Sequence, residues 1–195
     1  MSNLGVLYCA QRKFAAAESM LREAWEGSLK SLGPEHSDTL SVGHNLAEVY
    51  RLEGNFSAAD TLLVQILDAR RRLSGATGLE TAYVMSTLAA LRIQQERHAE
   101  AEALARDSLK VFTDKGPTVF RRFRAEALLG AALAAQQKYA EAEPLLLSGC
   151  NGMKARAAHS LEIARLTESH RWLVQLYENW GKPERAAEWR NQPRN

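Results

Sequence analysis

Apolar and small residues in the chain recur with the spacing of α-helices. Between Ser37 and Gly54 they follow a helical period and not the alternation of a strand. The apolar and small positions in this stretch are Leu40, Gly43, Leu46, Ala47, Val49 and Tyr50. Ser37 or Asp38 is expected to accept the unpaired backbone N–H groups at the start of this helix. Gly54 and Asn55 are expected to end it and to cap the following one, so the pattern predicts two helices joined by a short turn.

The same pattern occurs five times along the chain. Each copy has an anchoring leucine and, thirteen residues later, an alanine. The leucines are Leu4, Leu46, Leu88, Leu129 and Leu173, and the alanines are Ala17, Ala59, Ala101, Ala142 and Ala186. Small residues directly after four of the leucines (Gly5, Ala47, Ala89 and Gly130) are expected to let the two helices of a unit approach closely. Because one such hairpin cannot bury its apolar face alone, the units are predicted to stack into a solenoid.

Turn sequences punctuate the helical pattern. They recur as "LGPEHSD", "SGATGLE", "DKGPT" and "NWGKPE", the last of these within the fifth unit. The predicted repeats span about residues 1–35, 36–77, 78–116, 117–159 and 160–191, and they form a single array over residues 1–195. The first repeat is short at its N-terminus, so the chain is expected to begin inside a longer array. The last repeat diverges, and Trp180 and Trp189 are expected to pack as a C-terminal cap. Pro144 is expected to be tolerated near the start of a second helix.

These residues carry a family resemblance. The segment "NLAEVYRLEGNFSAADTLL" resembles a tetratricopeptide repeat, and the 42-residue period with "SLGPEHSDTL" and "KYAEAEPLLLSG" resembles the kinesin-light-chain-like subtype. The tail, "ESHRWLVQLYENWGKPERAAEWR", is similar to repeat regions of bacterial proteins in which such repeats follow a serine/threonine kinase domain. The resemblance implies an all-α, right-handed superhelical solenoid of about five antiparallel helix pairs.

The resemblance also implies a site. In such arrays the first helices of successive units line a concave groove that holds a partner protein or peptide. The positions of this chain that match the groove are Asn3, His44, Asn45, Glu48, Arg51, Tyr83, Thr87, Arg124, Leu128, Arg171, Trp172 and Gln175. Asn3 and Asn45 match the asparagines that hold peptide backbone in the subtype, and an amide suits this role because it both donates and accepts hydrogen bonds. The clamp that some members use for a terminal carboxylate is not matched.

Composition and charge narrow the classes of function that this chain can have. Hydrophobic residues make up 46% and charged residues 25%, as in an ordinary globular chain, and a net charge of +2 is too small for a nucleic-acid footprint. No apolar run is long enough to cross a membrane. Cys9 and Cys150 stand far apart with no metal-ligand spacing, which favours a reduced, cytoplasmic chain. We find no phosphate loop, metal site or catalytic motif, and we expect no cofactor and no enzyme.

The sequence therefore predicts a non-catalytic module that binds a partner protein or peptide in its groove. Two alternatives stay open. One is a regulatory or sensory fragment of a larger protein, such as a kinase-linked array. The other is a structural array that associates with itself through its open N-terminal end.

Overall fold

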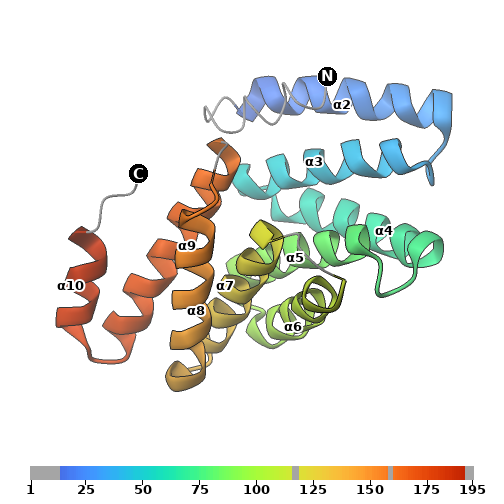
Figure 1. Cartoon of the computed structure of the whole chain (residues 1–195). Helices are drawn as coiled ribbons and strands as arrows, with labels where there is room; N and C mark the ends of the chain where they lie inside the picture. The colour runs from blue at the N-terminus through green and yellow to red at the C-terminus, as the bar shows by residue number, and fades with distance from the viewer. Residues whose placement is uncertain (1–13, 116–118, 158–159, 192–195) are drawn as a thin grey trace. The chain divides into compact units, whose positions relative to one another are not determined.

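The computed structural model describes residues 14–115, 119–157 and 160–191. Within these ranges the chain forms nine α-helices and no strand, which confirms the predicted all-α fold (Figure 1). The helices are α2 (Phe14–Leu32), α3 (Ser37–Glu53), α4 (Phe56–Ser74), α5 (Leu79–Gln94), α6 (His98–Asp114), α7 (Val119–Ala135), α8 (Tyr139–Lys154), α9 (Ser160–Asn179) and α10 (Pro183–Asn191). The first helix predicted for repeat one, which would carry Asn3 and Cys9, lies outside the described residues.

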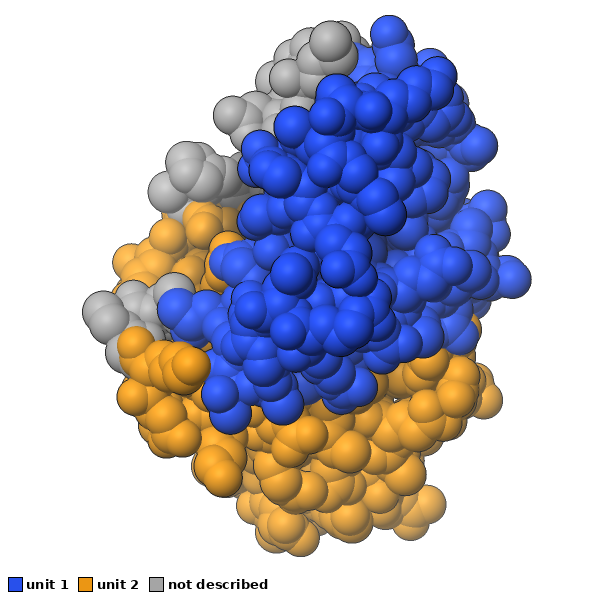
Figure 2. All heavy atoms as spheres, turned by 90° about the vertical axis from the view of Figure 1, so that its right-hand side faces the viewer, with its two compact units in different colours: residues 1–91 blue, residues 92–195 orange. Residues whose placement is uncertain are grey.

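The chain divides into two compact units, residues 1–91 (unit 1) and residues 92–195 (unit 2), which Figure 2 colours separately. In unit 1, α2, α3 and α4 follow one another as antiparallel neighbours (Figure 1). In unit 2, α7 packs against both α6 and α8, and α9 packs against α8 and α10. The prediction of a single array over the whole chain stays a prediction.

The turns of unit 1 show how the sequence sets the helix ends. The cap of α3 is His36, and not Ser37 or Asp38 as expected: its Nδ1 accepts a hydrogen bond from Asp38 N at 3.2 Å. The difference arises because His36 is extended while the backbone N–H of Leu40 already donates to its carbonyl, so the helix starts one residue earlier. At the other end Gly54 adopts the left-handed conformation with φ of 85°, and Asn55 Oδ1 accepts from Ala58 N at 3.3 Å, which confirms their predicted roles.

One expectation about unit 2 is also confirmed. Helix α8 continues through Pro144, in its second turn, without a break. The tryptophans of the last repeat pack onto neighbouring helices: Trp180 stacks on Tyr139 of α8 with ring centroids 5.8 Å apart, and Trp189 meets His170 of α9 edge-on at 4.8 Å. Trp189 is only 8% exposed. The role of these tryptophans as a C-terminal cap stays a prediction.

Close helix approach at small residues holds the helix pairs together. All five alanines of the repeat pattern have no exposed surface. At Gly130 of α7, a Cβ would lie 2.7 Å from Leu146 Cγ and 3.0 Å from the backbone nitrogen of Leu146. The backbones of α7 and α8 are therefore too close for any side chain at this position, as the sequence pattern predicted.

A charged network joins α6 to the end of α7 in unit 2. Glu102 Oε2 accepts from Lys138 Nζ at 3.0 Å and from Gln136 Nε2 at 2.8 Å, and Glu102 Oε1 lies 2.7 Å from an Arg106 nitrogen. The hydrogen bond from Lys138 is the largest of the effects that lower the pKa of Glu102 to about 2. Because the folded-state pKa lies below the ordinary value of 4.5, this network stabilises the fold fully above about pH 4.5 and is lost as the pH falls toward 2.

Ala59→Leu should lower the free energy of unfolding by about 1–3 kcal/mol, because the fully buried Ala59 leaves no space for three more heavy atoms. Ala58→Leu is the control, since Ala58 is only half-buried one residue before it on α4, and it should cost less. Thermal melts of the two variants test the helix register. An Ala59→Leu protein as stable as the wild type would contradict it.

Gly130→Ala should destabilise the fold by about 1–3 kcal/mol, since the new methyl group would meet the α8 backbone. Gly27→Ala provides the matched control on α2, where nothing lies within 4 Å of the added Cβ. That substitution should stabilise the protein by about 0.5–1 kcal/mol through helix propensity. Urea denaturation of both variants should therefore give shifts of opposite sign, and shifts of the same sign would refute the close approach.

Glu102→Gln should lower the urea midpoint at pH 7, and its difference from the wild type should shrink as the pH falls from about 4.5 toward 2. The exposed Glu141→Gln, outside the network, is the control and should leave the midpoint almost unchanged. A Glu102→Gln effect that is constant from pH 7 to pH 3 would show that the charge of Glu102 does not act through this network.

Candidate functional site

The predicted site residues of α3 and α5 in unit 1 form a buried polar cluster. His44 Nε2 lies 2.9 Å from Thr87 Oγ1, and the His44 ring meets Tyr83 edge-on with centroids 4.5 Å apart. His44 and Thr87 are each 5% exposed, whereas Tyr83 is half-buried. The structure thus brings together three residues from two repeats that the sequence placed on the same face.

Glu48 and Arg51 form a buried ion pair one turn further along α3. Arg51 Nε donates to Glu48 Oε2 at 2.8 Å, and a second nitrogen of the guanidinium donates to Oε1 at 3.1 Å. This bidentate geometry suits the planar guanidinium, and Arg51 is only 2% exposed. Both charges are therefore used within α3, and the pair rigidifies the helix face beside Asn45.

Asn45 differs from its neighbours on α3. Its side chain is half-buried, and its carboxamide forms no hydrogen bond within the described part of the chain. A carboxamide can offer two donors and one acceptor oxygen to a ligand. Asn45 is accordingly the predicted groove residue of α3 that keeps its hydrogen-bonding capacity for another molecule.

The predicted residues of α7 in unit 2 support α9. Arg124 donates to Glu168 Oε2 at 2.9 Å, and its guanidinium carbon lies 5.9 Å from the centre of the Trp172 ring. Arg124 is 6% exposed and Leu128 is fully buried. Leu128 therefore contributes to the core, whereas Arg124 forms a buried charge pair. The contacts of Arg124 hold Glu168 and Trp172 in position on α9.

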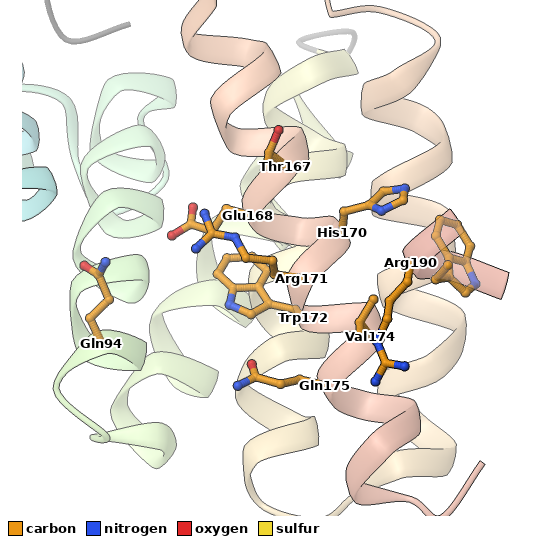
Figure 3. A pocket seen from close by; sticks show the side chains of 10 residues that line it. Gln94, Thr167, Glu168, His170, Arg171, Trp172, Val174, Gln175 and Arg190 are labelled. Atoms are coloured by element: carbon orange, nitrogen blue, oxygen red, sulfur yellow. The ribbon is translucent and has the colours of Figure 1, made fainter. Parts of the chain in front are cut away.

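A pocket of about 520 Å³ lies along α9 in unit 2 (Figure 3). The residues that line it are Gln94, Thr167, Glu168, His170, Arg171, Trp172, Val174, Gln175, Trp189 and Arg190. Arg171, Trp172 and Gln175, which were predicted from the repeat register, all lie in this wall, and in Figure 3 they point to the side that faces Gln94. His170, Val174 and Arg190 lie on the opposite side of the helix.

Sequence reasoning missed the parts of this pocket that come from other helices. Gln94 belongs to α5 and Arg190 to α10, and nothing in the repeat register indicates that either lies beside α9. Trp189 was expected to pack as a cap, and its contact with His170 makes it a wall of the pocket as well. The missing information is the packing angle between helices, which a repeat pattern does not specify.

The pocket offers a mixed chemical surface. Arg171 is exposed, and no carboxylate pairs with it among the residues that the structure describes. Gln175 is exposed and Trp172 half-buried, so an amide and part of an indole ring are also accessible. The carboxylate of Glu168 is bound by Arg124, and Arg190 pairs with Glu178. The accessible groups therefore include the guanidinium of Arg171, the amide of Gln175 and part of the Trp172 indole ring.

Other reactive groups in the described ranges do not form a second chemical site. Burial raises the pKa of the Cys150 thiol to about 12, so this thiol stays protonated at neutral pH. No three histidine, cysteine or acidic side chains gather there as metal ligands. None of the helices in these ranges is both long enough and apolar enough to cross a membrane.

Comparison with known proteins identifies the class. The tetratricopeptide repeat family model matches residues 1–71 and 40–114, more than half of the chain, and the chain belongs to this family. A search of curated proteins gives no significant match.

Solved structures share the fold at low sequence identity. Two are structures of a Podosopora anserina protein described as a kinesin light chain with nearly identical TPR-like repeats. The structure of its glutamine-to-methionine variant matches with a TM-score of 0.72 and 21% sequence identity, and the match covers 98% of this chain and 90% of that one. The other structure matches with a TM-score of 0.71 and 20% identity, and the match covers 96% of this chain and 89% of that one. A third, BtubC (BKLC) from P. vanneervenii, has a TM-score of 0.69 and 19% identity, covering 95% and 74%. The fold is therefore that of kinesin-light-chain-like repeat proteins.

Proposed function

We propose that this chain is a non-catalytic module that binds extended segments of a partner protein against its first helices, α3 in unit 1 and α9 in unit 2. The observation that carries the proposal is the pocket on α9. Three residues that the repeat register predicted as groove residues, Arg171, Trp172 and Gln175, line that pocket. Tetratricopeptide repeats generally mediate protein–protein interaction, and a pocket at the predicted position supports the same role for this chain.

The side chains on these helices divide into two groups, and the division suits peptide binding. One group is bonded within the protein: His44 with Thr87, Glu48 with Arg51, and Arg124 with Glu168. These pairs hold the helix surfaces rigid, so less conformational entropy is lost when a ligand binds.

The second group, Asn45, Arg171, Trp172 and Gln175, is partly or fully exposed. The two amides can each donate to and accept from a peptide backbone without regard to its sequence. Arg171 can bind a carboxylate or a backbone carbonyl, and Trp172 offers apolar surface to a side chain. In unit 1 the amide of Asn45 would bind the polar backbone of a segment. In unit 2 Arg171, Trp172 and Gln175 would bind backbone and hold one side chain.

The test begins with a partner caught at the pocket. A photo-crosslinking amino acid at Thr167, which lines the pocket but has its hydroxyl bonded within α9, should capture a protein in cells. The affinity of that purified partner is then measured by calorimetry. Asn45→Ala and Gln175→Ala should each weaken binding by about 1–3 kcal/mol, or roughly five- to 150-fold, while the melting temperature stays nearly constant.

Asn151→Ala is the matched control, since it removes an exposed carboxamide from α8, a second helix of its repeat. It should leave the affinity unchanged. A partner whose affinity is insensitive to both Asn45→Ala and Gln175→Ala would refute the proposal. So would a loss of binding that merely follows a loss of thermal stability, because it would assign the two amides a structural role.

A further inference from the structure

A second hollow lies in unit 1, away from the bonded residues of α3 described above. It has a volume of about 400 Å³ and is formed by α2, α3 and α4, which lie next to one another in Figure 1. Its lining consists of Trp25, Leu46, Tyr50, Asn55, Ser57, Ala58, Thr61, Leu62 and Gln65. All of these side chains are uncharged. We call it the α2–α4 pocket.

The walls of the α2–α4 pocket are apolar and fixed in place. Leu46 and Leu62 are buried, and the hydroxyl of the buried Tyr50 accepts a hydrogen bond from an Arg22 nitrogen at 2.8 Å. The indole of Trp25 packs closely against α3, where its Nε1 would lie 3.0 Å from a Cβ at Gly43. Such a hollow, with aromatic and aliphatic walls at the lower end of the volume range of ligand pockets, suits an apolar side chain.

The mouth of the pocket is made by neutral side chains of α4. Ser57 and Gln65 are exposed, and the Thr61 hydroxyl donates to Ser57 O at 3.0 Å within its own helix. Hydroxyl and amide groups at the rim can accommodate the polar backbone of a segment whose apolar side chain enters the pocket.

The next repeat shows that the pocket is a local feature of this repeat pair. In the 42-residue register, Tyr50 corresponds to Arg92 and Ala58 to Glu100. Arg92 is 6% exposed, and its Nε lies 3.2 Å from Glu100 Oε2. An ion pair therefore occupies in repeat three the positions that in repeat two are an aromatic wall and a small residue.

The charged residues near Tyr50 favour a cationic partner segment. Arg22, which donates to the Tyr50 hydroxyl, is itself paired with Glu18. The charged groups that act on Tyr50 among the described residues are the carboxylates of Glu18 and Glu53 and the guanidinium of Arg22, so two negative charges stand against one positive charge behind this wall of the pocket. The excess of negative charge near Tyr50 would attract a cationic segment to the neutral mouth of the pocket.

We propose that the α2–α4 pocket is a second docking site, which binds a partner protein segment that inserts one large apolar side chain flanked by lysine or arginine. The site is separate from the function proposed above, because it uses a different set of α3 residues, Leu46 and Tyr50 in place of Asn45 and its neighbours. It would let unit 1 hold a partner independently of the α9 pocket.

The experiment uses three labelled helical peptides and the full chain. The first peptide carries one central leucine flanked by lysines, the second has alanine in place of the leucine, and the third has glutamates in place of the lysines. Binding is measured by fluorescence anisotropy. The NMR signal of the Trp25 indole N–H, assigned with the Trp25→Phe variant, reports whether the peptide binds at the α2–α4 pocket. The first peptide should bind tighter than the alanine peptide by about tenfold or more. It should bind tighter than the glutamate peptide by about threefold or more.

Matched variants locate the site on α4. Thr61→Arg places a long cation in the mouth of the pocket and should lower the affinity for the first peptide by about tenfold. Val64→Arg adds the same charge at an exposed position outside the lining, and it should change that affinity by less than about twofold. Ser57→Arg, also at the mouth, serves if Thr61→Arg lowers the melting temperature. Asn45→Ala and Gln175→Ala should leave this binding unchanged, which separates the two proposals.

Three results would overturn the proposal. The first is equal binding of the leucine and alanine peptides, and the second is an equal loss with Thr61→Arg and Val64→Arg. The third is a concentration-dependent dimer in sedimentation that Thr61→Arg abolishes, because the occupant would then be a second copy of this chain.

Discussion

Close approach of helix backbones at small residues governs how the helix pairs of this protein pack. Ala59 and Ala142 have no exposed surface, and Gly130 has no room for a Cβ against Leu146. Since the two helices of a pair are joined this tightly, their outward faces are set in fixed register. Side chains that are 42 residues apart in sequence can therefore take equivalent places in successive repeats.

Some of these equivalent positions are occupied by buried ion pairs that stabilise the fold. The Glu48–Arg51 pair is enclosed within α3, and Arg124 reaches from α7 to Glu168 on α9. Burying an unpaired charge costs free energy, so each member of a pair needs the other and is not available to a ligand. Such pairs leave fewer positions for ligands than the repeat pattern suggests, and they orient those that remain, Asn45 above all.

Substitutions within one register also give each repeat its own surface. Tyr50 and Ala58 leave a hollow between α2 and α4, whereas Arg92 and Glu100 place an ion pair at the same positions of the next repeat. The helix pairs keep the same fold in both cases because the anchoring leucine and the small residues are unchanged. Similar scaffolds can thus present an apolar pocket in one repeat and a charged surface in the next.

Local periodicity and capping are encoded in the sequence, so the helix pairs, their turns and the small residues at their contacts could be predicted from it. The groove positions Arg171, Trp172 and Gln175 came from the resemblance to tetratricopeptide repeats. The three-dimensional packing was needed to find which groove residues are bonded within the protein, and that helices α5 and α10 supply walls to the pocket. Burial and cross-helix pairing depend on distances between segments far apart in the chain, and a repeat register carries no information about those distances.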